Sequence, residues 1–546
     1  MNKKLFINLL AVLTVSSAFV GCSNKSSSKN ISRATGMRIN DRNGGFQYNS
    51  NFKEQATPPG MVFIEGGTFT MGKVQDDIMH DWNNTPTQQH VQSFYMDETE
   101  VTNIMWMEYL DYIRTVYPPE NVDYRKIYIG ALPDTLVWRN QLGFNEVMVN
   151  NYLRHPAYAE YPVVGVNWVQ AVEFSEWRTD LANMAVLQRE GYLAQDAHTR
   201  VEAGSTFSTE TYLDYPDKTF GGNIDTLAGR RAVRDTILSL PGRTSGVLFP
   251  EFRLPTEVEW EYAALALVGI RNYNTYRGKK KYPWDGEYTR AGNRKSRGDQ
   301  LANFKQGKGD YGGIAGWSDD GGDITVQVKS YPPNDFGLYD MAGNVAEWVA
   351  DVYRPIVDDE ANDFNYYRGN VYYKNKIRPD GKPDIVTVDK IQYDTLSNGR
   401  IVARVLPGEL EKVPVDESDT YLRTNFSTAD NRGYRDGDQS STRYFERFYD
   451  EDEDSEKGMY NAPKHKVFSD TLGNLVREYD KSSNRTTLVN DETRVFKGGS
   501  WRDRAYWLDP AQRRYLPQYM STDYIGFRCA MSRVGTKAKK KKRPRG

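Results

Sequence analysis

The chain has 546 residues, of which 38% are hydrophobic and 26% are charged, and its formal net charge is -2. This composition is typical of a globular protein with enough apolar residues for a core. The near-neutral charge provides no basic footprint for nucleic acid, so we expect no nucleic-acid partner.

The chain begins with a pattern typical of an export signal. Lys3 and Lys4 precede an apolar run over residues 5–20, which is too short for a comfortable membrane span. The run closes with FVGC, ending at Cys22, which resembles the lipobox of bacterial lipoproteins, whose cysteine is acylated, for example by palmitate. We predict a signal peptide over residues 1–21 and a lipid anchor on Cys22. The alternative is an ordinary secretory signal with a chance cysteine.

Cysteine and histidine usage argues against several kinds of site. Cys22 and Cys529 are the two cysteines of the sequence, so lipidation of Cys22 leaves no intramolecular disulfide and no cysteine cluster for zinc. The histidines fall at wide spacings, and no two share a helical face, so we expect no histidine metal site. They are His80, His90, His155, His198 and His465.

Polar segments flank the globular sequence. Residues 22–58 are rich in Ser, Asn, Gly and Arg, which predicts a lipidated N-terminus and a flexible tether. Residues 536–546 contain the run KAKKKKRPRG, which predicts a disordered basic tail. Contact of this tail with anionic lipid, cell wall or an acidic partner is the alternative.

Patterns of apolar and turn residues predict the first elements of the globular part. The sequence GMVFIEGGTFTMG, from Gly60, alternates and turns at residues 65–67, which predicts a β-hairpin. Residues 94–103 predict a strand that leads into a helix with apolar residues at helical spacing. Residues 161–166 predict a short apolar strand.

Two capping boxes predict the starts of further helices. Asn167 is followed three residues later by Gln170, and Thr256 is followed three residues later by Glu259. Each pair precedes residues at helical spacing, so we expect a helix after each box.

The stretch NDFGLYDMAGNVAEWVAD, over residues 334–351, allows two interpretations. Asn334 and Gly343 predict turns, while Asn344 and Glu347 match a capping box that opens a helix with Trp348 on its inner face. In the other interpretation, carbonyl groups near Gly343 and the Glu347 carboxylate bind calcium through hard oxygen ligands.

Nine motifs then occur in order between about Gly60 and Arg533. They are MVFIEGGTFTMG, VTN, PVVGVNW…AVEFSEW, FRLPTEVEWEYAA, YPWDG, LANF, PPNDFGLYDMAGNVAEW, FKGGSW and GFRCA. This set resembles the formylglycine-generating enzyme, or sulfatase-modifying factor, family. The resemblance implies a loop-rich, irregular α+β fold related to C-type lectins, with two small mixed sheets, over residues 59–535. Compared with the family, two intervals are long, so we expect insertions at about 181–250 and 352–493.

The resemblance also indicates where catalytic residues would lie. Formylglycine-generating enzymes oxidise a substrate cysteine with two cysteines, five residues apart after GGS, that bind copper(I) through thiolates. In this sequence Asp503 and Leu508 occupy those positions. We therefore expect no catalytic residue, no copper and an inactive relative of the enzyme. Cys529 falls at a structural position of the family, which predicts a buried, unreactive thiol.

Calcium sites are the other feature that the resemblance implies, which makes calcium a candidate structural cofactor. The first set is the Asn303 side chain, the Phe304 carbonyl, the Asp320 side chain and the Gly322 carbonyl. The second set is the carbonyls of Ala342, Gly343 and Val345 with the Glu347 carboxylate. The alternative is an ion-free domain in which Asp320 caps a turn and Glu347 a helix.

The lipoprotein signal, the long insertions and the sequence SRATGMRINDRNGGFQYN together resemble the gliding-motility lipoproteins of the Bacteroidota. This implies an outer-membrane lipoprotein, on the periplasmic face, needed for gliding and type IX secretion. We predict a scaffold for other components of that machinery, including a GldK-like lipoprotein and ring components. The acidic run DEDEDSEKG and the basic tail are candidate docking charges. The alternative is a glycan- or peptidoglycan-binding module in the former active-site cleft, lined by Trp501, Arg502, Arg513 and Arg514.

Overall fold

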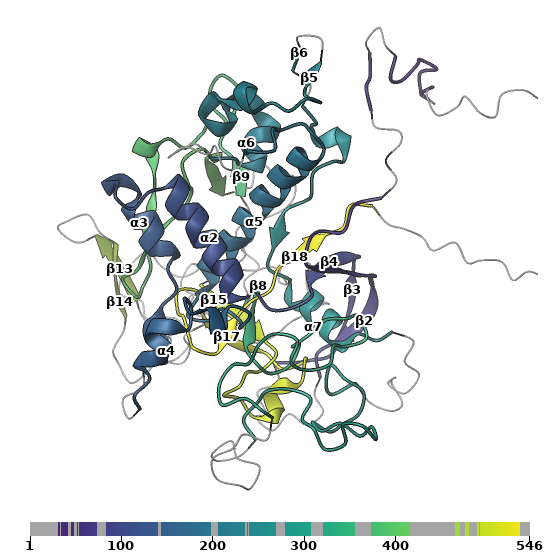
Figure 1. Ribbon diagram of the computed structural model, residues 1–546, viewed down its shortest axis with the longest axis vertical. Coiled ribbons are helices and arrows are strands. Elements are labelled where there is room, and N and C mark those ends of the chain that lie inside the picture. The colour runs from purple at the N-terminus through teal and green to yellow at the C-terminus, as the bar shows by residue number, and fades with distance from the viewer. Residues whose placement is uncertain are drawn as a thin grey trace, which may run out of the picture. The chain divides into compact units, whose positions relative to one another are not determined.

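The fold is described from a computed structural model (Figure 1). It describes residues 31–32, 34–41, 45–48, 52, 54–73, 83–139, 143–197, 206–234, 237–238, 240–268, 279–306, 320–354, 373–414, 465–469, 475–479, 489–490 and 492–535. The predictions for the signal peptide, Cys22, the acidic run at 450–458 and the basic tail lie outside these residues, as do His80 and His198.

Contacts divide the chain into two compact units. The first consists of residues 1–55 and 240–248, and in its described part an isolated bridge joins Ile31 to Arg38. The second consists of residues 56–239 and 249–546, and it contains the sheets and helices that position the site.

Two four-stranded sheets form the centre of the second unit. The first sheet is antiparallel, with the strand order β1-β4-β18-β7. Its strands are β1 (Met61–Ile64), β4 (Phe94–Asp97), β18 (Ala530–Ser532) and β7 (Phe252–Arg253). The second sheet has the order β16-β15-β8-β17 and is mixed, because β17 runs parallel to β8. Its strands are β16 (Arg514–Pro517), β15 (Thr493–Lys497), β8 (Ala346–Val352) and β17 (Ile525–Gly526). The expectation of two mixed sheets therefore holds for the second sheet only.

The predicted hairpin at residues 60–72 is wrong. Strand β1 pairs with β4, whereas the following strand β2 (Gly67–Met71) pairs with β3 (Thr87–Val91) in a separate two-stranded sheet. The chain turns a corner at Gly66, where a Cβ atom would lie 2.3 Å from the backbone oxygen of Val91. Such a close approach of two backbones requires glycine. The glycines therefore mark a crossing from one sheet to another.

The described helices are α2 (Asn103–Val116), α3 (Val122–Ala131), α4 (Glu146–Asn151), α5 (Trp168–Arg189), α6 (Thr209–Asp214) and α7 (Glu257–Leu265). Of these helices, α7 packs against β8 and β15 and α5 packs against β7. The described 3-10 helices of this unit are η2 (Thr135–Trp138), η3 (Pro156–Tyr158), η5 (Pro216–Gly222), η6 (Ile224–Leu227), η8 (Val388–Lys390) and η11 (Ala505–Leu508). The 3-10 helix η7 (Arg243–Ser245) belongs to the first unit. Separate helices and sheets joined by long loops give a mixed α and β fold, as the sequence predicted.

Both predicted capping boxes are confirmed. In α5 the Asn167 side chain accepts from the Gln170 N–H at 2.9 Å, and the Gln170 side chain accepts from the Asn167 N–H at 3.0 Å. In α7 the corresponding bonds between Thr256 and Glu259 measure 3.2 and 3.0 Å. The helix predicted after residue 103 is confirmed as α2. The strand predicted at 161–166 is wrong, because only an isolated bridge between Thr102 and Pro162 forms there.

The predicted helix after Asn344 is also wrong, because residues 346–352 form the interior strand β8. Asn344 has a positive φ of 57° and does not cap a helix. Its side chain accepts from the Val326 N–H and donates to a Glu100 carboxylate oxygen. The turn predicted before the strand is confirmed, since the Asn334 side chain accepts the N–H groups of residues 336 and 338.

The two predicted insertions form small sheets of their own. In the first interval, β5 (Val233–Arg234) pairs with β6 (Ile237–Leu238). The described pairs in the second interval are β9 (Tyr373–Asn375) with β12 (Lys412–Pro414), β10 (Tyr393–Thr395) with β11 (Ile401–Ala403), and β13 (His465–Ser469) with β14 (Leu475–Tyr479). The 181–250 interval begins inside α5, because this helix continues to Arg189.

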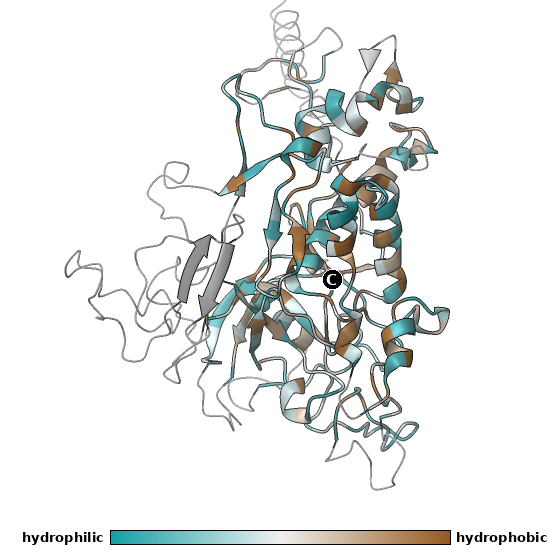
Figure 2. Ribbon diagram, turned by 90° about the vertical axis from the view of Figure 1, so that its left-hand side faces the viewer, coloured by the Kyte–Doolittle hydropathy of each residue, from teal (hydrophilic) through white to brown (hydrophobic). Residues whose placement is uncertain are grey.

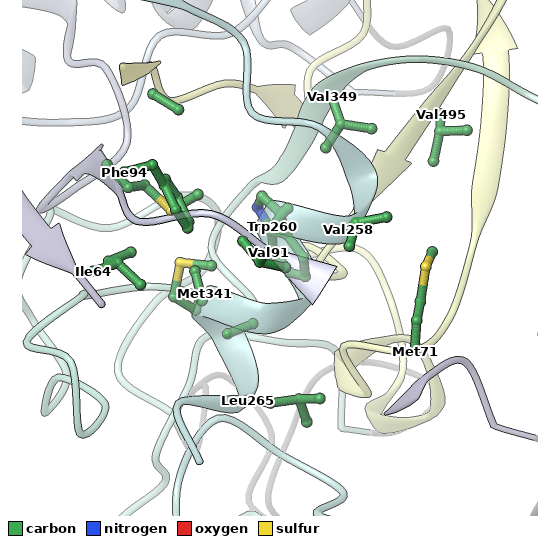
Figure 3. Close-up of a cluster of buried hydrophobic side chains, with 14 of the residues drawn as sticks. Ile64, Met71, Val91, Phe94, Val258, Trp260, Leu265, Met341, Val349 and Val495 are labelled. Carbon is green, nitrogen blue, oxygen red and sulfur yellow. The ribbon is translucent and has the colours of Figure 1, made fainter. Parts of the chain in front are cut away.

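One large cluster of the core lies where α7 packs against both sheets and the β2-β3 pair (Figure 3). Trp260 of α7 is fully buried and lies beside Val91 and Met341 in this view. Figure 2 shows helices with hydrophobic and hydrophilic residues side by side, as expected for helices that cover a core. None of the helices in the described part of the chain is long and apolar enough to cross a membrane.

Candidate functional site

The segment that corresponds to the catalytic loop of formylglycine-generating enzymes follows β15. Gly498 and Gly499 have φ angles of 98° and 70°, which glycine adopts without strain. A Cβ atom at Gly499 would lie 2.9 Å from the backbone oxygen of Trp507, so the loop folds back tightly on η11. This turn places Asp503 and Leu508, which occupy the positions of the family's two cysteines, in different surroundings.

The Asp503 carboxylate is held by an ion pair. Both terminal nitrogens of Arg514 donate to it at 2.7 Å, and the Ser500 hydroxyl donates to it at 2.5 Å. The Arg514 guanidinium lies 4.6 Å from the ring centre of Phe496 and 4.7 Å from that of Trp507. A bidentate pair packed between two aromatic rings is a well-defined structural contact.

Leu508 is fully buried and packs in an apolar cluster. Its buried neighbours there are Tyr282, Ala302, Phe304 and Ala342. A carboxylate in an ion pair and a leucine in a core offer no soft sulfur ligand, so these two positions do not provide a copper(I) site.

Cys529 is fully buried, as predicted for a structural thiol. It lies 3.4 Å from the Ser175 hydroxyl. Burial, with a further contribution from the nearby Asp97 charge, raises the pKa of Cys529 to about 12, although Arg178 opposes this. The thiolate is the reactive form of cysteine, so this thiol is unreactive at neutral pH.

The four residues predicted to line a cleft do not share one wall. Trp501 stacks on Trp138, and its Nε1 donates to the backbone oxygen of Asp523. Arg502 is half exposed and pairs with the Asp523 carboxylate at 2.7 Å. Arg514 is held by Asp503, as described above. Arg513 is buried and donates to the carboxylate of Glu257 at 2.6 and 3.0 Å. Arg513 is therefore part of the core and is not placed to contact a ligand.

The first predicted calcium set is brought together. The Asp320 carboxylate accepts the N–H of Phe304 at 2.9 Å and the N–H of Gly322 at 3.2 Å. A Cβ atom at Gly322 would lie 3.2 Å from the Asn303 side chain. The Asn303 Oδ1 is buried and has no hydrogen-bond partner within the described ranges of the chain. An orphaned buried amide oxygen close to a carboxylate is the kind of hard oxygen donor that calcium prefers.

The second predicted set does not fit a cation as arranged. Arg528 donates to both Glu347 oxygens, at 2.7 and 2.8 Å, and the Trp260 Nε1 donates at 2.7 Å. Glu347 and Arg528 are both fully buried, so the guanidinium already supplies the positive charge. A cation ligated by Glu347 would have to compete with it.

A second buried carboxylate, which was not predicted from the sequence, lies near this pair. Glu100 accepts from the Asn344 side chain at 2.9 Å and from the Val345 N–H at 3.2 Å. Burial, together with the charges of Asp340 and Glu347, raises the pKa of Glu100 well above its usual range. The VTN motif directly after Glu100 is interpreted as part of a strand that leads into a helix, and not as a sign of a buried carboxylate.

Comparisons with known proteins identify the family of the domain. The sulfatase-modifying factor enzyme 1-like domain matches residues 47–384. The mouse (Mus musculus) formylglycine-generating enzyme is 25% identical over 292 residues, which cover 53% of this chain and 58% of the mouse protein. The chain therefore spans somewhat more than half the length of this relative.

Two further similarities concern an inactive relative and a solved structure. The mouse protein named inactive C-alpha-formylglycine-generating enzyme 2 is 39% identical over 108 residues, covering 20% of this chain and 28% of that protein. The structure of PvdO from Pseudomonas aeruginosa aligns with 86% of this chain and 94% of its own, at 16% identity and a TM-score of 0.35. Since the domain match covers more than half of the sequence, the chain belongs to the sulfatase-modifying factor enzyme 1-like domain family.

Proposed function

We propose that this chain is a non-catalytic member of its family and a lipid-anchored scaffold. It is held on the periplasmic face of the outer membrane through Cys22 and docks components of the gliding-motility and type IX secretion machinery. The components we expect are a GldK-like lipoprotein and ring proteins. Within this proposal the domain keeps the C-type-lectin-like relation of its family. The two insertions supply surface that a compact enzyme of the family lacks.

The residues at the two cysteine positions support the proposal that the chain is non-catalytic. Asp503 is bound by Arg514 on both carboxylate oxygens, and Leu508 is buried among aromatic and small apolar residues. Copper(I) requires soft ligands, which neither residue offers. The remaining described thiol, Cys529, is buried and has a raised pKa. The glycan-binding alternative is less favoured, because Arg513 of its proposed lining is buried in an ion pair with Glu257.

An oxidation assay tests the absence of catalysis. The purified chain is loaded with copper(I) and incubated with oxygen and a cysteine-containing peptide, and mass spectrometry detects formylglycine. An active formylglycine-generating enzyme serves as the positive control. We expect no product above a blank that contains copper alone. Aldehyde formation above that blank, saturable in the peptide, would contradict the proposal.

Crosslinking tests the scaffold. The tagged, lipidated chain is crosslinked in native outer membranes and purified, and mass spectrometry identifies what is recovered. We expect gliding or type IX components in near-stoichiometric amounts, with crosslinks within residues 181–250 or 352–493. The control variant Cys22→Ala should leave the outer-membrane fraction. Recovery of the lipidated chain alone would refute the scaffold.

A structural calcium ion on the first set is part of this proposal. The residues that would hold it are Asn303, Phe304, Asp320 and Gly322. An ion that binds only the folded state stabilises it by about 2.7 kcal/mol at one hundred times the Kd. We expect calcium chloride to raise the melting temperature of the parent relative to EDTA. Asp320→Asn should abolish this rise, whereas Asp323→Asn, at a neighbouring exposed residue, should keep it. No rise in the parent would exclude the ion.

A further inference from the structure

A cavity lies between the family core and the two inserted segments. Its water-accessible volume is about 40 Å³, and it opens to solvent. Helices α2, α3 and α5 form one side, and residues 206–208 and 402–409 form the other. The second side falls within the two intervals predicted to be insertions, outside the nine motifs of the sequence.

Hydrogen bonds hold residues 407–408 in place at this cavity. The hydroxyl of Tyr117, at the end of α2, donates to the backbone oxygen of Pro407 at 2.9 Å. The hydroxyl of Thr211, in the 181–250 interval, donates to that of Gly408 at 2.8 Å. A Cβ atom at Gly130 of α3 would lie 2.8 Å from the backbone oxygen of Ile401. The close backbone approach and the bonds hold the walls of the cavity in place.

Carboxylates gather on the cavity wall. Glu173, Glu176 and Asp180 follow one another on α5, and Glu409 faces them from the insertion. Asp180 accepts the N–H of Thr209 at 2.7 Å, and Glu409 accepts the N–H of Leu406 at 3.0 Å. Within the described part of the chain, the Glu173 carboxylate makes no hydrogen bond or ion pair. One carboxylate of the wall is thus left without a partner.

Positive charge near the cavity does not balance these groups. Lys412 lies 3.9 Å from Glu176 and 3.6 Å from Glu210, so one ammonium is shared by two carboxylates. Arg404 lines the cavity, but its guanidinium is bound by both oxygens of Asp394. Burial, followed by the charges of Glu176 and Glu409, raises the pKa of Glu173 to about 8. Arg400 acts in the opposite direction but more weakly. Such a shift is what uncompensated carboxylates produce.

Aromatic rings also line the cavity, in addition to the acidic residues. Tyr109, Tyr112 and Trp177 lie together, with ring centres of Trp177 at 5.3 Å from Tyr109 and 6.2 Å from Tyr112. The Trp177 Nε1 is buried and has no hydrogen-bond acceptor among the residues that the structure describes. Aromatic faces attract cations, and an indole N–H seeks an acceptor such as a carbonyl.

The spacing of the acids distinguishes between kinds of cation. Among the residues that the structure describes, no three His, Cys, Asp or Glu side chains lie close enough together to hold a metal ion. A larger organic cation needs no such convergence, since carboxylates and aromatic faces contact it from several sides. We propose that this cavity binds an alkylammonium group, either of a free amine or of a lysine side chain presented by a polypeptide.

Ligand-observed NMR titration of the full chain tests the proposal. The probes are protonated butylamine, Nα-acetyl-lysine amide and the neutral 1-pentanol. A ligand of five non-hydrogen atoms has a ceiling of about -1.5 kcal/mol per atom, so a weak, saturable affinity is expected. We expect butylamine or the lysine amide to bind and pentanol to show no saturable binding. Tighter binding of the lysine amide would assign the site to a polypeptide, and tighter binding of butylamine to a free amine.

Matched variants locate the site. Glu173→Gln with Glu176→Gln should weaken binding by about tenfold or more, because each glutamine keeps the shape and removes the charge. Glu108→Gln, at an exposed position of α2, should leave the affinity unchanged. If the double variant does not fold, as circular dichroism would show, Glu173→Gln alone replaces it. Absence of saturable binding of both cations to the parent, or equal affinity in the glutamine variant, would refute the proposal.

Discussion

Helices α5 and α7 begin with the same capping box but carry their carboxylates in opposite electrostatic surroundings. On α7, Glu261 accepts from Lys279 at 2.6 Å and from Lys497 at 3.2 Å. Glu257 accepts from Arg513 at 2.6 Å and from Lys497 at 3.3 Å. Three cations therefore serve two carboxylates. Although burial alone would raise the pKa of Glu261, the two lysines hold it below its usual range.

On α5 the balance is reversed. Glu173, Glu176 and Asp180 face the cavity with Glu409, and Lys412 is the cation that lies near them. Burial raises the pKa of each of Glu176, Asp180 and Glu409 to about 7. The α7 ion pairs tie this helix to β15 of the second sheet and to residues 279 and 513. The α5 charges cost stability and are better explained by a ligand than by the fold.

Removing a shared cation from α7 should give the largest effect. Lys497→Met leaves Glu257 and Glu261 with one partner fewer in a fully buried position. Leaving a buried charge uncompensated costs about 3–5 kcal/mol of unfolding free energy. Urea unfolding followed by circular dichroism measures this loss.

The control for this variant is an exposed lysine. Lys295→Met should change the unfolding free energy by less than about 0.5 kcal/mol, as is usual at surface positions. Adding Glu261→Gln to Lys497→Met should recover part of the loss, because it removes one of the uncompensated charges. Equal stability of Lys497→Met and Lys295→Met would contradict the structural role of the α7 network.

Neutralising an acid on α5 should increase the unfolding free energy, whereas Lys497→Met should lower it. The size of the increase should depend on pH. The pKa of Glu173 is about 8 in the folded chain, against an ordinary value of 4.5. Between these values the folded state holds the proton more tightly, so the parent loses stability as pH rises. Glu173→Gln avoids that loss.

We therefore expect Glu173→Gln to match the parent near pH 4 and to be more stable at pH 8. The gain should be roughly 1–2 kcal/mol, less than the full shift implies, because the cavity opens to solvent and water screens the charges. Thermal unfolding at both pH values measures it. The other charged groups that face Glu173 are Glu176, Glu409 and Arg400, and they are unchanged in the variant. A loss of stability at pH 8 would show that Glu173 is paired.

The α5 and α7 starts were predictable from sequence because their signal is local. A box of Asn167 with Gln170, or Thr256 with Glu259, satisfies helix N–H groups within four residues of chain. The same local pattern at Asn344 and Glu347 failed. There, pairing of β8 with β15 and β17, and burial of Glu347 on Arg528, outweighed the local preference.

The cavity could not be predicted from the sequence. It depends on residues 402–409 returning to α2 and α5 from more than 200 positions away in the chain. The acidic residues of α5 occur at helical spacing, but such a row is usually a solvated face. Similarly, the positions of Asp503 and Leu508 followed from the family motif, whereas the Arg514 ion pair required the folded loop.

Removing the helix caps should give the smallest losses of unfolding free energy. The loss should be equal for α5 and α7. Thr256→Ala and Asn167→Ala each remove one side chain that accepts a helix N–H, at a cost of about 1 kcal/mol of unfolding free energy. Asn145→Ala is a matched control, because Asn145 precedes α4 without a side-chain capping bond. We expect its loss in urea unfolding to be near zero. A much larger loss for Asn167→Ala would show that α5, which carries the acidic wall, depends on its cap more than α7 does, and hence that the uncompensated carboxylates weaken the helix itself.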